Sequence, residues 1–350
     1  MKDQMTRKSR DKGSILILSL WTVVFLTFIA VMLGGSAGTG IRFSGRIEDI
    51  SISYDLASSG MLYAIRTIAA GKLDTSPSTD ALNDQWANDP SIFGEVKLGE
   101  GSYGFAYDKK DDSSGQVLTY FGMVDEERKL NLNYADREEI VRLLLELTDM
   151  DQVRATELAA SIIDWRDVDD ILYNTVDSAS ERAAYVRAAL AYAPANENFH
   201  ELGQLMFVNG MDPKVFVRIR DYVTVHSTGR ININTATAEV LVAIGLSSDM
   251  ADKVKLFRAG QDGTEGTYDD NVFTSVNKVS GDLEGHFALT DAEKDEITRF
   301  VATGKLSVRS DNFMAVCTGH VAGAGTSGKV ISVFDRNGNI KYWGYVSLAS

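Results

Sequence analysis

The sequence predicts an α+β protein with a long N-terminal helix, an antiparallel β-sheet domain and a large all-α insertion. An uncharged apolar run fills residues 14–33, strand patterns occur before residue 130 and after residue 305, and helical periodicity fills most of the region between. Because strands flank the helical block, we expect one sheet domain that the helices interrupt. The expected segments are a leader (1–13), a transmembrane helix (14–37), the N-terminal portion of the sheet domain (38–129), the insertion (130–304, as repeats 130–225 and 226–304) and the C-terminal portion of the sheet domain (305–350).

The apolar run is long enough to cross a bilayer as a helix, which takes about 20 residues. Basic residues lie on the N-terminal side of this run, at Lys2, Arg7, Lys8, Arg10 and Lys12. Positive charge favours the cytoplasmic side of a membrane. We therefore expect a cytoplasmic N-terminus and export of everything after Gly34.

The junction Gly13–Ser14 resembles the cleavage site of a type IV prepilin leader, in which a Gly directly precedes a long apolar helix. In that family a peptidase cuts after the Gly and leaves the apolar segment on the mature protein. Two other interpretations are a secretory signal peptide cut near Ser36–Ala37 and a signal anchor that is never cut. The run is longer than the ordinary signal-peptide core of about 7–15 residues.

The pattern continues with a helix over 41–70, a polar connection over 71–92 and strands on both sides of the helical block. The Gly-rich stretch 34–40 is expected to be a soft point between the apolar run and this helix. Asn337-Gly338 supplies the turn of a C-terminal hairpin. The expected strands are 95–98, 102–108, 117–124, 306–308, 313–318, 329–334 and 340–346, and the expected helices of the insertion are 137–147, 152–165, 178–192, 201–208, 213–222, 236–244, 248–257 and 291–302.

Composition excludes several classes of function. The net charge of −14 over 350 residues argues against binding of nucleic acid, which needs a basic face. The single cysteine, Cys317, excludes an internal disulfide and a zinc site built on paired cysteines. The sequence has no nucleophile elbow, phosphate loop or HExxH motif, so we expect no catalytic residues and no enzymatic activity.

The helical block contains an internal duplication, because residues 130–141 align with residues 231–242. Both copies carry the pattern N-x-N-x-A before a short helix, with Asn133 and Asn234 as candidate N-caps. This is the opening of a helix-hairpin-helix motif of the SAM-like kind. In its DNA-binding form the hairpin reads G-x-G and its amides contact phosphate. The hairpins here, 147–152 and 245–249, lack the second Gly and carry acidic residues, which favours a structural role.

Taken together, these features resemble the type II secretion system protein K family, also called general secretion pathway protein K, over nearly the whole chain. The matching stretches are the Gly13–Ser14 junction, Asp164-Trp-Arg-Asp-Val-Asp-Asp170, Tyr192-Ala-Pro-Ala-Asn196, Glu201–Met211 and Thr224–Glu239. The family is also similar in lacking the glutamate that most pilins have at the fifth mature position, which is Leu18 here.

The resemblance implies a pilin-like sheet domain and a minor pseudopilin at the tip of a pseudopilus, which assists fibre initiation and protein export across the outer membrane. It implies cleavage and methylation at the Gly13–Ser14 junction, a single-pass location in the inner membrane and a periplasmic body. The implied partners are other minor pseudopilins, the major pseudopilin, the inner-membrane assembly platform, prepilin peptidase and the secretin or the cargo. The alternatives are a minor pilin of a type IV pilus and an exported helix-hairpin-helix protein that binds DNA.

Two acidic clusters are candidate metal sites. The first comprises Asp164, Asp167, Asp169, Asp170 and Glu181. The second lies in a Gly-rich loop and comprises Asp262, Thr264, Glu265, Asp269 and Asp270, of which Asp262, Asp269 and Asp270 are the candidate ligands. Several carboxylates on one loop suit Ca²⁺, which takes 6–8 oxygen ligands. The competing interpretation is a solvated acidic loop that caps helices. The two clusters together as one site are a further alternative.

Overall fold

The structure is a computed structural model of the 350-residue chain. It describes residues 10–73, 76, 78–110, 117–173 and 180–346, with side chains left out at 10–13, 35–42 and 109–110. Most of the predicted leader, residues 1–9, lies outside the described residues, as does the beginning of the helix expected over 178–192.

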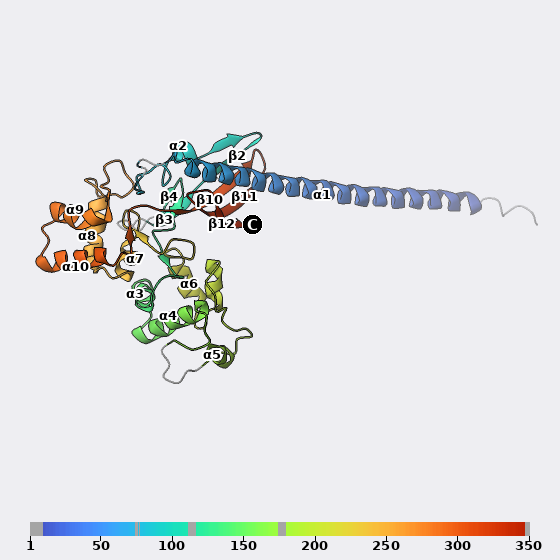
Figure 1. Cartoon of the computed structure of the whole chain (residues 1–350). Coiled ribbons are helices and arrows are strands. Elements are labelled where there is room, and N and C mark those ends of the chain that lie inside the picture. Colours follow the sequence, from blue (N-terminus) through green and yellow to red (C-terminus); the bar gives the residue numbers. More distant parts are fainter. Residues whose placement is uncertain (1–9, 74–75, 77, 111–116, 174–179, 347–350) are drawn as a thin grey trace, which may run out of the picture.

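Helix α1 runs without interruption from Arg10 to Ala69, a length of 60 residues. Its N-terminal half extends away from the body of the molecule, and its C-terminal half lies along the sheet (Figure 1). The Gly-rich stretch 34–40, which we expected to be a soft point, is part of this helix. Glycine lowers helix propensity but does not by itself end a helix.

The main sheet has the order β1-β2-β10-β11-β12, and β5 also pairs with β10. All of these pairings are antiparallel. The turn between β11 and β12 contains Gly338 at a φ of 85°, as the predicted Asn-Gly hairpin requires. The strands are β1 (Val96–Leu98), β2 (Gly101–Phe105), β5 (Val124–Asp125), β10 (Asn312–Val321), β11 (Ser327–Asp335) and β12 (Ile340–Val346).

Two small elements stand beside this sheet. Helix α2 (Pro90–Phe93) was not predicted, and β3 (Tyr107–Lys110) with β4 (Val117–Tyr120) forms a separate two-stranded sheet. The expected strand over 102–108 is therefore split between two sheets.

Glycines bring α1 unusually close to the sheet. A Cβ on Gly319 of β10 would lie 2.1 Å from the backbone oxygen of Ser53 on α1, and one on Gly328 of β11 would lie 2.6 Å from Tyr54 N. The core between these layers contains Met61, Ile68 and Phe313 among others. The close approach lets the helix bury an apolar face directly against the strands.

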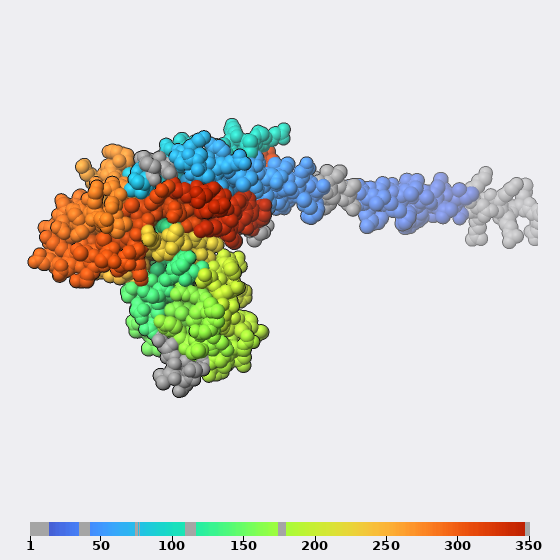
Figure 2. Space-filling view, viewed as in Figure 1, coloured from blue at the N-terminus to red at the C-terminus, as the bar shows by residue number. Residues whose placement is uncertain are grey.

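The insertion follows β5 and consists of two halves (Figures 1 and 2). The first half, coloured green to yellow, projects away from the axis of α1. It contains β6 (Leu130–Asn131), α3 (Arg137–Leu147), α4 (Gln152–Arg166), α5 (Glu181–Arg187), the 3₁₀-helix η1 (Leu202–Phe207), α6 (Pro213–Ile219) and β7 (Val223–Thr224). The second half contains β8 (Ile231–Asn232), α7 (Ala238–Ala243), α8 (Ser248–Arg258), η2 (Val276–Lys278), α9 (Val279–His286), α10 (Asp291–Ala302) and β9 (Leu306–Ser307).

The insertion is not all-α, which corrects the prediction. Strand β6 pairs with β7 and β8 pairs with β9, and both pairings are parallel. The strands are two residues long, too short to show an alternating pattern. Helix α9 was missed, because two glycines weaken its helical signal.

The two halves open with the same set of contacts. Asn133 donates to the Phe199 carbonyl and accepts from its N–H, and Asn234 does the same with Phe273. Arg166 donates to the carbonyls of Leu132 and Ala135. Arg258 donates in the same way to the carbonyls of Ile233 and Ala236, the corresponding positions of the second half.

The prediction that Asn133 and Asn234 are N-caps is therefore wrong. Asp136 caps α3 in a capping box with Glu139, and Thr237 precedes α7. Each asparagine instead binds a loop that is distant in sequence. Its side-chain amide accepts from the N–H of one residue in that loop and donates to the carbonyl of the same residue. A single apolar core runs through both halves of the insertion, where α3 packs against α7.

We expect Gly319→Ala to destabilise the chain by about 1–3 kcal/mol, because the added methyl group must push α1 away from the sheet. Gly281→Ala is the matched control, since a Cβ there meets nothing within 4 Å and the position lies inside α9. The control should be neutral or stabilising by about 0.5–1 kcal/mol. Chemical unfolding of the detergent-solubilised chain measures both, and equal effects would contradict the close-packing explanation.

Candidate functional site

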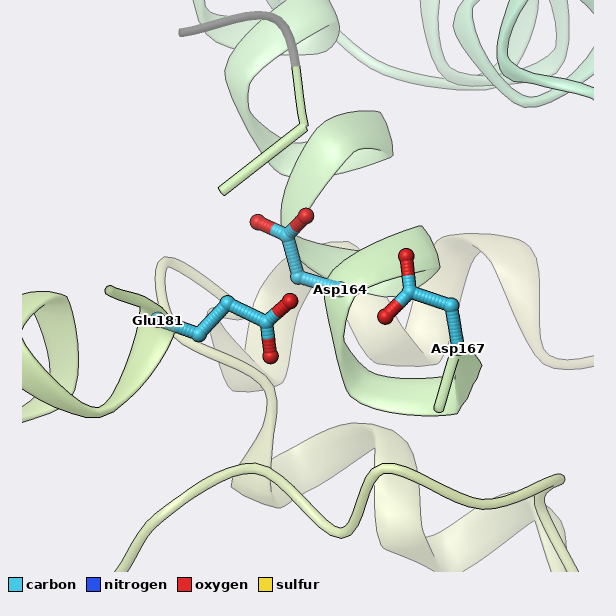
Figure 3. A group of neighbouring side chains, drawn as sticks. All are labelled: Asp164, Asp167 and Glu181. Atoms are coloured by element: carbon cyan, nitrogen blue, oxygen red, sulfur yellow. The ribbon is translucent and has the colours of Figure 1, made fainter. Parts of the chain in front are cut away.

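The candidate site lies at the far end of the first half of the insertion, where α4 ends and α5 begins (Figure 3). Asp164 is in the last turn of α4, Asp167 is the C-cap of that helix, and Glu181 is the first residue of α5. Ser180 caps α5 by accepting from the Ala183 N–H. The two helix ends therefore fix all three acidic residues.

The three carboxylates converge. One oxygen from each of Asp164, Asp167 and Glu181 lies within 4.8 Å of the other two. Among the described residues, no group donates a hydrogen bond to the buried oxygens of Glu181 or to Oδ1 of Asp167, whereas Oδ1 of Asp164 accepts from the Tyr173 N–H at 2.7 Å. Buried carboxylate oxygens without a partner are costly, so this arrangement is prepared for a further group.

The electrostatics of the group agree with its geometry. Burial, together with the charges of Asp167 and Asp164, raises the pKa of Glu181 to about 8. Burial also raises the pKa of Asp164 to about 6, against the hydrogen bond from Tyr173. The pKa of Asp167 is raised by burial and by the Asp169 charge. Three like charges at this distance repel one another unless a proton or a cation joins them.

The donor set fits a hard divalent cation. All three side chains offer anionic oxygen, and Ca²⁺ prefers oxygen ligands in flexible arrangements that water and backbone carbonyls complete. Arg166 lies next in sequence, but its guanidinium donates to the carbonyls of Leu132 and Ala135.

Asp169 and Asp170, the other predicted ligands of this cluster, do not join the three. Asp170 accepts from the Ser180 hydroxyl at 2.9 Å and from the Arg182 N–H at 3.1 Å, so it helps to cap α5. Asp169 accepts from the Ile171 N–H within its own turn. The structure thus divides the first cluster into converging carboxylates and carboxylates that close the loop.

The second cluster closes its own loop. Asp269 accepts from the N–H groups of Gln261 and Asp262, and Asp270 accepts from those of Gly266 and Thr267. Asp262 accepts from Thr264 N. Within the described residues of the chain, the acidic group whose oxygens are close enough to share a cation is Asp164, Asp167 and Glu181.

Sequence reasoning missed the supports of the site. Tyr173 N holds Asp164, and Trp165 stacks on Phe199 and Phe207 at ring distances of 6.0 and 6.4 Å. The signal for Ser180 was present, since a serine before an acidic first turn is typical of an N-cap. Spacing gave no signal for the aromatic stack.

The N-terminal half of α1 is long and apolar enough to cross a membrane. Ser14–Gly34 forms a 21-residue apolar segment, and none of it is buried within the chain. Gly13 and Ser14, the predicted processing residues, lie in the first turns of this helix. Leu18, at the fifth position after Gly13, is 71% exposed.

The hairpins of the insertion carry acidic groups. Asp151 caps α4, and Asp149 pairs with Arg218 at 2.7 Å. In the other hairpin Ser247 caps α8 and donates its N–H to Glu296. Carboxylates at these turns oppose the approach of a phosphate backbone.

Comparison with known proteins gives concordant results. Residues 127–228 match the family described as type II secretion system (T2SS), protein K. Type II secretion system protein K of Pectobacterium carotovorum subsp. carotovorum is 32% identical over 114 residues, which are 31% of this chain and 34% of that protein. The match therefore spans about a third of the length of this relative.

The fold has a solved counterpart. A chain in the crystal structure of the GspK-GspI-GspJ complex from the type 2 secretion system of enterotoxigenic Escherichia coli superposes with a TM-score of 0.58. The superposition covers 89% of this chain and 99% of that one, at 16% sequence identity. Residues 127–228 thus match type II secretion system protein K, and the chain has the fold of a component of the GspK-GspI-GspJ complex.

Proposed function

We propose that this chain is a minor pseudopilin of a type II secretion system. The observation that carries the proposal is the junction within α1, where an unburied apolar segment continues as the helix that packs on the sheet. Such a helix anchors the chain in a membrane before assembly and packs against other apolar helices afterwards. The family match over residues 127–228 and the shared fold support the same conclusion.

The proposed location is the inner membrane, with a single span and a periplasmic body. The basic residues before Ser14 favour a cytoplasmic N-terminus. The proposed partners are other minor pseudopilins, since the solved counterpart belongs to a complex of GspK with GspI and GspJ. The major pseudopilin, the assembly platform, prepilin peptidase and the secretin or cargo complete the proposed set.

We propose a position at the tip of the pseudopilus. Leu18 stands where most pilins have a glutamate that pairs with the N-terminal amine of a neighbouring subunit. Without that carboxylate, this chain does not need a neighbouring subunit whose amine it would bind in the membrane. The first half of the insertion projects sideways from the axis of α1 (Figure 2). A projection of this kind is accommodated more easily at the end of a fibre than within it.

The proposed ligand of the first acidic cluster is Ca²⁺, held by Asp164, Asp167 and Glu181. Its role is to join the end of α4 to the start of α5 by neutralising three buried carboxylates. We propose a structural role for these three carboxylates.

Processing tests the proposed class of protein. Intact mass of the membrane-extracted chain should show loss of residues 1–13 when a prepilin peptidase is co-expressed, and no loss without it. Gly13→Leu should abolish the cleavage, because the peptidase of this family cuts after glycine. Ala37→Leu is the control and should cleave normally. Cleavage near Ala37, or cleavage that does not depend on the peptidase, would contradict the proposal.

Calcium removal tests the proposed metal site. With a weak extracellular-type dissociation constant of about 10⁻⁴–10⁻³ M, 10 mM Ca²⁺ should stabilise the chain by about 1.4–2.7 kcal/mol. For a chain of this length, that corresponds to a rise in Tm of roughly 2–4 °C over the chelated protein. Thermal unfolding followed by circular dichroism measures the shift.

Glu181→Gln should remove most of this Ca²⁺ response, because it deletes a buried anionic ligand. Asp262→Asn is the matched control, since Asp262 belongs to the loop that satisfies its own carboxylates. A full response in Glu181→Gln, or loss of the response in Asp262→Asn, would overturn the assignment of the site.

A further inference from the structure

A pocket in the first half of the insertion has no part in the proposed function. It lies between α3 and α4 and has a volume of about 250 Å³. Sites that enclose a whole small molecule are larger, at roughly 300–1,000 Å³. The pocket therefore suits a very small ligand or the end group of a larger one.

Arg142 gives this pocket its chemistry. Its Nε donates to the Ala243 carbonyl at 2.7 Å, and Ala243 is the last residue of α7. The final carbonyls of a helix have no partner within the helix, so this hydrogen bond is favourable and fixes the plane of the guanidinium. Among the residues that the structure describes, no group accepts a hydrogen bond from the two terminal nitrogens of Arg142. Its structural role thus uses one guanidinium nitrogen and leaves two available to a ligand.

The second guanidinium of the pocket shows which partner suits such a group. Arg137 donates from Nε and Nη2 to the Glu138 carboxylate, at 3.2 and 2.8 Å. A guanidinium presents parallel N–H groups in a geometry that matches a carboxylate. Glu138 therefore offsets the charge of Arg137, whereas Arg142 has no such partner among the described side chains.

The remaining acidic residues of α3 leave the charge of Arg142 unpaired. Glu139 pairs with Lys305 at 2.6 Å, and Glu146 is exposed to solvent. The lining thus keeps one unpaired positive charge in a chain whose net charge is −14. This charge complementarity selects an anionic ligand, and the guanidinium geometry selects a carboxylate.

The rest of the lining adds hydrogen-bonding groups and apolar surface. Gln152 and Thr156 line the pocket from α4, and the Gln152 amide can both donate and accept. The Thr156 hydroxyl donates to the Gln152 carbonyl at 2.7 Å. Val141, which is buried, and Leu145, which is partly buried, supply the apolar part of the lining. A ligand that uses all of these groups has a carboxylate, an apolar side chain and an amide.

We propose that this pocket binds the C-terminal residue of another protein chain, with the terminal carboxylate on Arg142. A C-terminal residue is the end group of a protein in which a carboxylate, a side chain and an amide lie within a few bonds of one another. An apolar last residue contacts Val141 and Leu145, and its amide meets Gln152 or Thr156. This inference goes beyond the proposed function and does not depend on it.

Saturation-transfer NMR, which observes the ligand, measures this binding in the full chain in detergent micelles. The probe is N-acetyl-L-leucine, which has the carboxylate, the apolar side chain and the amide. Its dissociation constant should be on the order of 1 mM. N-acetyl-L-leucine amide lacks the carboxylate and should bind at least about tenfold more weakly. Equal binding of these two probes would overturn the proposal.

A third probe separates a protein C-terminus from a free carboxylic acid. Isocaproate keeps the carboxylate and the branched apolar group but has no amide. It should bind about threefold to tenfold more weakly than N-acetyl-L-leucine, because it cannot form the hydrogen bonds to α4. If isocaproate binds as tightly or more tightly, the pocket takes a free acid and the assignment to a protein terminus is wrong.

Arg142→Lys tests the residue that carries the proposal. Lysine keeps a positive charge at the end of α7 but cannot present two parallel N–H groups. The binding of N-acetyl-L-leucine should weaken by at least about tenfold. Arg154→Lys makes the same exchange at an exposed position of α4 outside the pocket and should bind like the wild type. Unchanged binding in Arg142→Lys would contradict the assignment.

Thr156→Phe decides the question if Arg142→Lys does not fold. Thr156 is partly buried on α4, where phenylalanine is about as good a helix former as threonine. The ring should fill the pocket while Arg142 stays in place, so binding of N-acetyl-L-leucine should be lost, and retained binding would refute the site. The comparison of the three probes on the wild type needs no variant and decides the question where neither variant folds.

Discussion

The unburied apolar half of α1 is the constraint on which the rest of the structure depends. Residues 14–34 expose an apolar surface that no other segment of the described chain covers. Water cannot solvate such a helix favourably, and under the proposed function lipid or the helices of other subunits cover it. The same helix continues and packs against the sheet. Contacts that fix its first half therefore also fix the position of the folded body.

The body is built so that its insertion keeps a defined orientation on this helix. Glycines at the helix–sheet contact remove the side chains that would separate the two layers. The insertion leaves and re-enters the sheet through one buried polar joint, where Asp80, Asp125 and Glu127 receive hydrogen bonds from both sides. The converging carboxylates of Asp164, Asp167 and Glu181 lie at the far end of the first half, and their position relative to α1 depends on that joint.

Much of the fold could be predicted because its signals are local. The apolar run, the helix over 137–147 and the Asn-Gly hairpin follow from composition, periodicity and turn chemistry at neighbouring residues. The parallel pairs β6–β7 and β8–β9 could not be predicted, because each joins residues about 75–93 positions apart through two residues per strand. For the same reason the roles of Asn133 and Asn234 were missed, since their partners Phe199 and Phe273 are distant in sequence. The spacing identified the residues of the first acidic cluster but not which of their carboxylates converge. Asp170, for example, helps to cap α5, and the spacing gave no sign of this.

Secretion in the native host tests most directly whether this chain is a pseudopilin subunit. The measurement is the distribution of the exported proteins between periplasm and medium in cells from which this chain has been deleted. Those proteins should accumulate in the periplasm, and the full chain should restore their export whereas the Gly13→Leu variant should not. Normal export in the deleted cells would contradict the central claim.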